Sequence, residues 1–334
     1  MHSNMNTSPA GAPRVGKAER KHKVVVIKVG KSSLLRKGHL HLSMLGALAD
    51  GLTEVTGFLE GEDSIATLRA FRAMGVQIEG PQQGRVVIHG VGLHGLKAPQ
   101  QPLDVGNAGT GMRLLAGLMA GQPFDTVLVG DESLSGRPMG RVADPLRAMG
   151  AKIETSEGGR PPLRISGGQQ LTPLNYTLPM ASAQVKSCLL LAGLYCAGET
   201  VVTEPAPTRD HTERMLRGFG YTVNSEPLDG GATRVSLRGG GALTGGRIDV
   251  PADISSAAFF MVAAAITPGS DITLEHVGIN PTRIGVVNIL RAIGAVGWME
   301  TLTAPLFGWL ELPSSVTLPI ITKAIAGGTA MMGV

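Results

Sequence analysis

The sequence predicts an α/β fold built from repeats of a single unit, and two recurring patterns carry this prediction. In the first, an amphipathic helix ends at a glycine and a strand follows, as in "ATLRAFRAMGVQIE", "RVADPLRAMGAKIE", "TERMLRGFGYTVN" and "GVVNILRAIGAVGWME". The glycines are Gly75, Gly150, Gly220 and Gly294, so the pattern returns every 70 to 75 residues. Glycine suits the end of a helix because the left-handed conformation often found there costs other residues a steric penalty.

The second pattern comes before each of these helices. It is a helix rich in alanine and leucine, then a glycine, then a strand of valine and threonine, as in "MLGALADGLTEVTG", "MRLLAGLMAGQPFDTVLVG", "VKSCLLLAGLYCAGETVVTE" and "FFMVAAAITPGSDITLEHV". Because this helix is apolar on nearly every face, we expect it to be buried inside a domain.

Two strands around a glycine-rich turn close the unit, as in "VQIEGPQQGRVVIHG" and "AKIETSEGGRPPLRISG". The unit is therefore βαβαββ, and the chain holds about four complete copies and a partial fifth that starts at "LPIITKAIAGGTAMMGV". We expect a disordered basic tail, an N-terminal strand with a crossover motif, a domain of three repeats and an incomplete second domain, at residues 1–22, 23–36, 37–246 and 247–334.

Composition excludes several classes of protein. A chain of 334 residues with 43% apolar and 17% charged residues can bury large cores, but its longest apolar run, residues 257–266, is too short to span a membrane. The net charge of +4 fits anionic partners, yet no basic stripe carries interleaved aromatic residues, so we expect no nucleic-acid partner. Cys188 and Cys196 share an apolar stretch, which predicts two core residues in a reduced, cytoplasmic chain.

Polar residues that break the repeat pattern are the candidates for function. The stretch "LDVGNAGTGMRLLAG" places Asn107, Gly109 and Thr110 just before a helix whose first turn carries Arg113. Free backbone N–H groups at a helix N-terminus favour an anion, although such a loop can also be a plain turn.

A second stretch, "GDESLSGRPMGRV", places Arg137 and Arg141 around another helix start, with Pro138 suited to the first helical position. Arg137 fits bidentate binding of a carboxylate or phosphate. Arg141 fits a solvated helix face equally well.

The stretch "PMASAQVKSCLLLAGL" puts Ser182, Gln184 and Lys186 where the repeat otherwise buries apolar residues. Such groups need partners, and an anionic, hydroxyl-rich ligand would supply them. The alternative for Ser182 is a plain helix N-cap.

Two further helix starts carry arginines. "TRDHTERML" gives Arg209, Asp210 and His211, of which Asp210 can be only the cap. "NPTRIG" gives Arg283, for which we expect a structural role.

These stretches belong to a longer ordered set: "GNAGTGMRLLAG", "GDESLSGRPMGRV", "ASAQVKSCLLLAGL", "TRDHTERML", "VPADISSAAFFMVAA" and "NPTRIGVVNIL". In this order they resemble the motifs of the 5-enolpyruvylshikimate-3-phosphate (EPSP) synthase family, over residues 43–298. The resemblance implies an enolpyruvyl transferase-like fold of two domains with three βαβαββ units each, and substrates in the cleft between them. It also implies that the 5-hydroxyl of shikimate 3-phosphate attacks C2 of phosphoenolpyruvate and that phosphate leaves, without a metal or organic cofactor.

The resemblance also implies residue roles. Gly109 and Arg137 would hold phosphoenolpyruvate, Arg137 as a catalytic residue, while Asn107 shapes their loop. The family's herbicide glyphosate competes in this subsite. The residues that would hold shikimate 3-phosphate are Ser182, Gln184 and Arg209.

The N-terminal motif is altered. The family reads Pro-Gly-Asp-Lys-Ser-x-Ser-His-Arg, whereas this chain reads "VGKSSLLR", in which Lys31, Ser32 and Arg36 keep their spacing. Lys31 would be catalytic, and Ser32 and Arg36 would bind substrate. We expect about five extra residues between Arg36 and a helix that starts near Met44. The stretch "KVVVIKVGKSSLL" alone also resembles the amino acid kinase family, whose glycine-serine loop meets ATP phosphates.

The sequence departs from the family again near its C-terminal end. The family's fifth copy opens with an aspartate that acts as the base on the 5-hydroxyl, but here "LPSSVTLP" holds that place and the later cationic motifs do not follow. We therefore expect impaired activity, with a monomer if the fold is complete and association through the shortened domain if it is not. Two alternatives keep the fold: a catalytically silent protein that binds shikimate 3-phosphate, and a UDP-sugar enolpyruvyl transferase, against which "TRDHTERML" argues.

Overall fold

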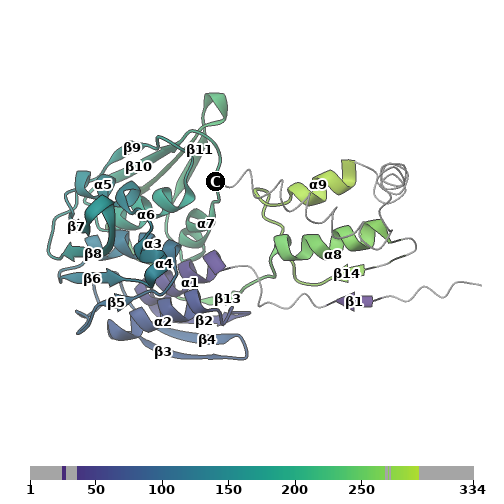
Figure 1. Cartoon of the computed structure of the whole chain (residues 1–334), viewed down its shortest axis with the longest axis horizontal. Coiled ribbons are helices and arrows are strands. Elements are labelled where there is room, and N and C mark those ends of the chain that lie inside the picture. The colour runs from purple at the N-terminus through teal and green to yellow at the C-terminus, as the bar shows by residue number, and fades with distance from the viewer. Residues whose placement is uncertain (1–24, 28–35, 268–269, 271, 293–334) are drawn as a thin grey trace, which may run out of the picture. The chain divides into compact units, whose positions relative to one another are not determined.

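A computed structural model of the chain describes residues 25–27, 36–267, 270 and 272–292 (Figure 1). The chain divides into two compact units. The larger unit comprises Lys28–Phe260 and Leu274–Ile293, and the smaller comprises Met1–Ile27, Met261–Thr273 and Gly294–Val334. The boundaries expected from the sequence for the tail, the crossover and the two domains stay predictions.

The larger unit repeats one order of elements. The first copy consists of α1 (Arg36–Leu48), β2 (Asp50–Thr56), α2 (Glu62–Ala73), β3 (Gln77–Gln82) and β4 (Arg85–Val91). The second consists of β5 (Leu103–Asp104), α3 (Gly109–Ala120), β6 (Thr126–Val129), α4 (Glu132–Ser135), α5 (Gly140–Ala148), β7 (Lys152–Ser156) and β8 (Arg160–Ser166). The third consists of β9 (Asn175–Thr177), α6 (Ala183–Gly193), β10 (Glu199–Glu204), α7 (His211–Gly218), β11 (Asn224–Pro227) and β12 (Thr233–Arg238).

The strands of each copy lie in a separate four-stranded sheet. The strand orders are β13-β2-β4-β3, β5-β6-β8-β7 and β9-β10-β12-β11, where β13 is Arg247–Asp249. In every sheet the first pair of strands is parallel and the other pairs are antiparallel. The first sheet takes its opening strand from beyond the third copy, because Arg247 in β13 lies opposite Glu54 in β2.

The helix-ending glycines adopt the conformation that the sequence predicts. Gly75, Gly150 and Gly220 have φ angles of 85°, 96° and 82°, in the left-handed region. After each one, the chain donates a backbone hydrogen bond back into the helix, for example from Val76 N to the carbonyl of Phe71 at 3.1 Å. The fourth glycine, Gly294, lies outside the described residues.

An arginine three residues before each of these glycines donates to a backbone carbonyl in or just before the next strand. The side chain of Arg72 donates to the carbonyl of Ile78, that of Arg147 to Ile153, and that of Arg217 to Val223. The Nε to oxygen distances are 3.3, 3.0 and 2.9 Å. The repeat therefore preserves a polar contact as well as an apolar pattern.

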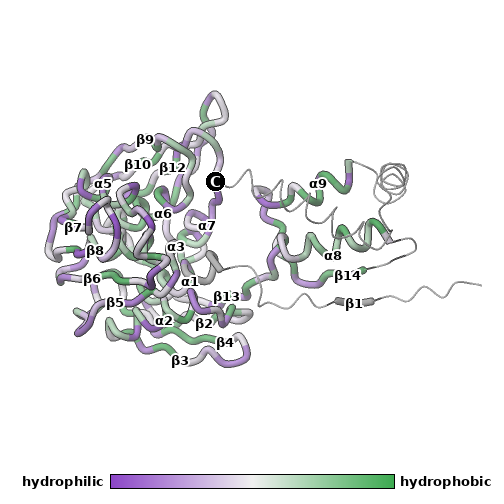
Figure 2. Tube along the Cα trace, in the orientation of Figure 1, coloured by the Kyte–Doolittle hydropathy of each residue, from purple (hydrophilic) through white to green (hydrophobic). Residues whose placement is uncertain are grey.

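The apolar helices are buried, as the sequence predicts. All residues of α3 except Thr110 are buried, and α6 is buried from Val185 to Gly193. The two helices approach so closely that a β-carbon on Gly117 would lie 2.3 Å from the carbonyl oxygen of Cys188. Figure 2 shows apolar stretches along α3 and α6 and polar stretches along the edge strands. These helices form the core of the larger unit.

One expectation about the first copy is wrong. Helix α1 begins at Arg36 and not near Met44, so no extra link separates Arg36 from the helix. Leu42, Leu45 and Leu48 follow one another at intervals of three residues, a helical spacing, and a glycine inside a helix, here Gly38, costs only about 1 kcal/mol. Residues 41–49 are buried.

The elements after the third copy again alternate strand and helix: β13, α8 (Ile254–Ile266), β14 (Ile272–Leu274) and α9 (Gly285–Ala292). Strand β14 pairs with β1 (Val25–Ile27), from the start of the chain. Within the described ranges, no helix combines the length and the apolar character needed to cross a membrane.

Candidate active site around Gly109 and Arg209

The turn before α3 is tied to the turn before α5. Asn107 donates from Nδ2 to the Asp131 carboxylate at 2.8 Å and accepts from Nη2 of Arg137. Asp131 also caps α4, because its Oδ1 accepts from the backbone N–H of Leu134 at 2.7 Å. Arg137 donates further to Oγ of Ser133 at 3.2 Å. Asn107 and Arg137, which the sequence singled out separately, are therefore in direct contact.

Gly109 lies between two guanidinium groups at the first residue of α3. A β-carbon on Gly109 would lie 3.0 Å from Nη1 of Arg137 and 3.1 Å from Nη1 of Arg113. A side chain at this position would push the two guanidinium groups away from the N-terminus of the helix. The helix dipole and the two cations therefore combine at one point.

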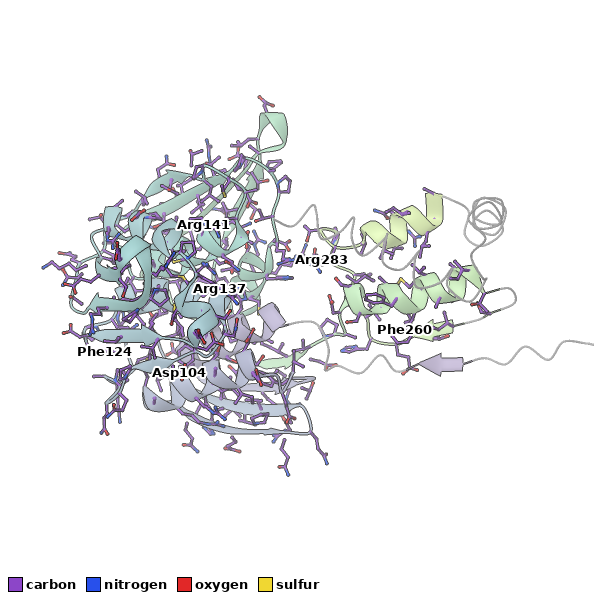
Figure 3. All side chains as sticks on the ribbon, viewed as in Figure 1. Asp104, Phe124, Arg137, Arg141, Phe260 and Arg283 are labelled. Carbon is purple, nitrogen blue, oxygen red and sulfur yellow. The ribbon has the colours of Figure 1, made fainter. Side chains whose placement is uncertain are left out.

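Arg113 is a buried cation, with 6% of its surface exposed. It donates to the carbonyls of Gly109 and Pro138 at 3.0 and 3.2 Å, and its Nε has no hydrogen-bond partner among the described residues. Burial lowers the pKa of Arg113, and the nearby charges of Arg141 and Arg137 lower it further. Arg141 itself is exposed, which fits one of its two expected roles, a solvated helix face. Arg137 and Arg141 are labelled in Figure 3. The arrangement concentrates positive charge where an anion could bind.

The N-terminus of α6 contacts the N-terminus of α3. Gln184 donates from Nε2 to Oγ1 of Thr110 at 2.8 Å, which joins the third copy to the second beside Gly109. Ser182 is the N-cap of α6, as one alternative expected, and its Oγ accepts from Val185 N at 3.5 Å. The structure therefore brings Ser182 and Gln184 to the same region as Gly109.

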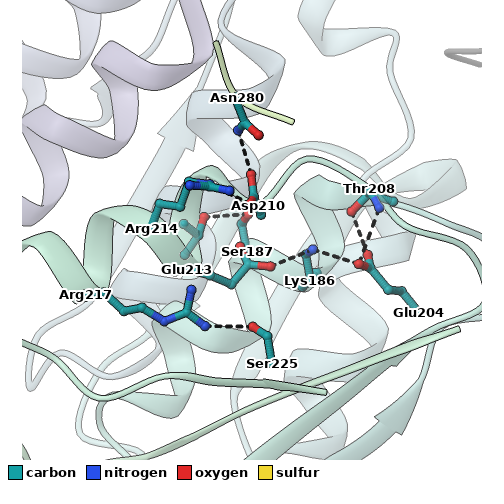
Figure 4. A network of polar contacts seen from close by, with 11 residues as sticks. Lys186, Ser187, Glu204, Thr208, Asp210, Glu213, Arg214, Arg217, Ser225 and Asn280 are labelled. Atoms are coloured by element: carbon teal, nitrogen blue, oxygen red, sulfur yellow. Dashed lines mark hydrogen bonds and ion pairs between the residues drawn. The ribbon is translucent and has the colours of Figure 1, made fainter. Parts of the chain in front are cut away.

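Lys186 already has partners within the protein, so the expectation that it needs a ligand is wrong. Its Nζ lies 3.0 Å from a carboxylate oxygen of Glu204 and 2.7 Å from one of Glu213 (Figure 4). All three side chains are buried. This pairing is not visible in the sequence, because the two glutamates lie on other elements, at the end of β10 and in α7.

The start of α7 carries a second group of charges. Burial lowers the pKa of Arg209, and the nearby Arg283 lowers it further, whereas Asp253 raises it. Arg283 donates to Oγ of Ser255 at 2.5 Å. Burial lowers the pKa of His211 as well, against the opposing charge of Asp210. Arg209 thus lies near both the cation of Arg283 and the carboxylate of Asp253.

Asp210 occupies the N-cap position of α7, but its side chain makes no capping hydrogen bond. It accepts instead from Nδ2 of Asn280 at 2.8 Å and from Nε of Arg214 at 2.6 Å. Burial alone would raise the pKa of Asp210, but these hydrogen bonds outweigh burial and lower it. Asn280, which the sequence reading did not select, therefore connects the segment before α9 to the start of α7.

Part of the expected site lies outside the described residues. This holds for Lys31 and Ser32, and for the side chain of Arg36, whose backbone begins α1. Among the described residues, no group of three or more histidine, cysteine, aspartate or glutamate side chains could hold a metal ion. Asp131 and Ser133 also support the site and were not selected from the sequence, although the position of Asp131 before "ESLS" is a cap signal.

Comparison with known proteins identifies the family. Residues 37–304 match the family model described as EPSP synthase (3-phosphoshikimate 1-carboxyvinyltransferase). A 3-phosphoshikimate 1-carboxyvinyltransferase of Hydrogenovibrio crunogenus is 67% identical over 252 residues, 75% of this chain and 57% of that protein. One of Alkalilimnicola ehrlichii is 69% identical over 252 residues, 75% of this chain and 55% of that protein.

The solved structures agree. An EPSP synthase structure from Acinetobacter baumannii is similar with a TM-score of 0.77 at 60% identity, over 81% of this chain and 59% of that one. The chain spans under three fifths of the length of the curated relatives it matches. These matches confirm the α/β fold and the resemblance that the ordered motifs carry. The chain belongs to the EPSP synthase family.

Proposed function

We propose that this chain binds shikimate 3-phosphate and phosphoenolpyruvate and transfers the enolpyruvyl group to the 5-hydroxyl of shikimate 3-phosphate, with release of phosphate. Membership of the EPSP synthase family supports this activity. The main observation behind the proposal is that the guanidinium groups of Arg137 and Arg113 both lie close to Gly109, at the N-terminus of α3. Gln184 is hydrogen-bonded to Thr110 in the first turn of the same helix.

Phosphoenolpyruvate is the proposed ligand of the Gly109 turn. Arg137 reaches the turn from a separate element, and Asn107 holds it there. A guanidinium binds a phosphate or carboxylate through two parallel hydrogen bonds, and the N–H groups at the start of α3 add further donors. Arg113 would stabilise the anion mainly through its charge, since its Nη1 and Nη2 atoms already donate to the carbonyls of Gly109 and Pro138.

Shikimate 3-phosphate is the proposed ligand of Ser182, Gln184 and Arg209. The hydroxyl of Ser182 holds its capping bond at 3.5 Å, long enough to leave the oxygen open to a second partner. Arg209 supplies a cation to the phosphate. In the proposed complete site, Ser32 and Arg36 bind the same substrate.

The chemistry explains why so many cations are proposed. The two substrates carry two phosphates and two carboxylates, which repel one another unless cations lie between them. The 5-hydroxyl oxygen bonds to C2 of phosphoenolpyruvate and loses its proton, while the C2–C3 double bond takes up a proton at C3. The tetrahedral intermediate then loses a proton from C3 and phosphate from C2, which restores the double bond. Arg137 and Lys31 are the proposed catalytic residues, because fixed cations beside the developing negative charge lower the barrier.

We also propose that the protein acts in the cytoplasm and that it is a monomer if its fold is complete. The two buried, unpaired cysteines support a reducing compartment. Size-exclusion chromatography with light scattering tests the monomer, and a concentration-dependent increase in mass would contradict it.

Two measurements on the purified chain test the activity. Phosphate release is measured with both substrates, and calorimetry measures binding of shikimate 3-phosphate alone. We expect release with both substrates, and loss of release in Arg137→Ala. The control is Arg164→Ala, which removes an exposed arginine of β8 and should leave the rate unchanged.

The outcomes separate the active enzyme from a silent homologue. Binding of shikimate 3-phosphate without phosphate release would reject the enzyme and favour a silent binding protein. Neither binding nor release would reject both. An unchanged rate in Arg137→Ala would remove Arg137 from the site.

A further inference from the structure

A buried ion cluster lies beside the proposed substrate residues of the third copy. We call Lys186, Glu204 and Glu213 the Lys186 cluster (Figure 4). The Lys186 side chain is 1% exposed, and Glu204 and Glu213 are 3% and 2% exposed. Buried ion pairs are often no more stabilising than apolar residues of the same size, so stability alone gives little reason for the cluster.

The cluster joins the elements that carry the proposed shikimate 3-phosphate ligands. Lys186 lies in the first turn of α6, two residues after Gln184. Glu204 is the last residue of β10, and Glu213 is the third residue of α7. Arg209 lies on the segment between β10 and α7. Substrate residues on two separate elements are thus linked through one buried lysine.

Glu204 also fixes the segment that leads to Arg209. Its Oε2 accepts from Oγ1 of Thr208 at 2.6 Å, and its Oε1 accepts from the backbone N–H of Thr208 at 3.3 Å. Pro205 and Pro207 have no backbone N–H, so the segment between β10 and α7 has few hydrogen-bond donors, and Thr208 supplies two of them. Thr208 precedes Arg209 directly.

A second contact joins α6 to α7 next to the Lys186 cluster. Thr212 donates from Oγ1 to Oγ of Ser187 at 2.7 Å, and both side chains are buried. This hydrogen bond therefore fixes α6 against α7 near Lys186. The segment before α7 is held instead by its hydrogen bonds to Glu204.

We propose that Glu204, held by Lys186, is a positioning residue for shikimate 3-phosphate. Its hydrogen bonds to Thr208 would fix the position of Arg209 with respect to Ser182 and Gln184. This inference rests on the proposed function. A segment ordered before binding spares the ligand the entropy cost of ordering it, so loosening the segment should weaken binding. Glu204 itself touches no substrate in this account.

The variant Thr208→Val tests the inference with little disturbance of the fold. It removes the hydroxyl that Glu204 holds and keeps the branched shape and the backbone N–H. We expect the dissociation constant of shikimate 3-phosphate, measured by calorimetry, to rise about tenfold, as loss of a hydrogen bond to a charged group predicts. Thr208→Ser keeps a hydroxyl and should restore binding. Where turnover is measured, KM for shikimate 3-phosphate should rise and kcat should not change.

Thr172→Val is the matched control. Thr172 lies between β8 and β9, and it donates from Oγ1 to the carbonyl of Met149 at 3.3 Å and not to a residue of the cluster. This variant should bind as the native chain does. Equal weakening in both valine variants, or unchanged binding in Thr208→Val, would overturn the inference.

Amide hydrogen exchange separates this inference from the proposed function. We expect Thr208→Val to speed exchange at residues 208–210 without ligand present, whereas Thr172→Val should not. If the native chain fails to bind shikimate 3-phosphate, the proposed function fails, and the exchange result alone decides the positioning role. Unchanged exchange in Thr208→Val would then overturn it.

Discussion

Gly117 of α3 faces the backbone carbonyl of Cys188 in α6, and a β-carbon on Gly117 would lie 2.3 Å from that oxygen. Gly117→Ala should therefore force the two buried helices apart. We expect the free energy of unfolding, measured in urea, to fall by about 1–3 kcal/mol, the usual cost of overpacking a core. An unchanged midpoint would contradict the close approach.

Gly218→Ala serves as the control for that measurement. Gly218 ends α7, and a β-carbon there would meet no atom within 4 Å. Alanine favours a helix over glycine by up to about 1 kcal/mol, so this variant should be equally stable or slightly more stable.

Gly109→Ala should act on the site and not on the fold. The added carbon would lie 3.0 Å from Nη1 of Arg137, the end of a flexible side chain that can give way. We expect KM for phosphoenolpyruvate to rise about tenfold as Arg137 shifts, with an unchanged unfolding midpoint. Gly136→Ala is the matched control beside Arg137, because its β-carbon would meet nothing closer than 3.6 Å. Equal KM values for both variants would contradict crowding at Gly109.

Glu213 should make stability depend on pH. Burial raises its pKa above the ordinary value of 4.5, although Lys186 opposes this. Above pH 4.5 the folded chain therefore holds this proton more tightly than the unfolded chain does, and stability falls as the pH rises through the folded pKa. Glu213→Gln cannot titrate, so its stability relative to the native chain should increase from pH 4.5 upward. Parallel curves of unfolding free energy against pH would refute this.

The cysteines should resist alkylation in the folded chain. Burial raises the pKa of the Cys188 thiol to about 12, and it raises the pKa of Cys196 as well. The reactive thiolate is therefore scarce near pH 8, and buried sulfur is also shielded from reagent. We expect mass spectrometry to show no iodoacetamide adduct on the native chain and adducts on both cysteines after unfolding. Rapid labelling of Cys188 without unfolding would show that α6 is not packed as described.

The sequence predicted what depends on local physics. The left-handed glycines at positions 75, 150 and 220 and the buried helices α3 and α6 follow from backbone sterics and apolar spacing, which a short window of sequence contains. The glycine-rich turn before α3 was predicted for the same reason, because small residues before a helix are visible in sequence, and its binding of an anion stays a prediction.

What escaped prediction depends on pairings between distant residues. We expected Lys186 to need a ligand because its partner Glu204 lies 18 residues away, and nothing in the sequence around Glu204 indicates a contact with α6. The contact of Arg137 with Asn107 spans 30 residues, and that of Asn280 with Asp210 spans 70. The start of α1 was missed for another reason: a polar first turn hid a helix whose apolar face begins later.

Strand β13 has a consequence for how the protein is made. The first copy leaves the ribosome early, yet its sheet lacks a parallel edge strand until Arg247–Asp249 has been synthesised and can pair with Glu54–Thr56. Such a distant pairing is slow to form, because the loop between the strands must be closed first. Until then, the edge of β2 stays open to other chains. The larger unit should therefore complete its folding late in synthesis, as one body and not copy by copy.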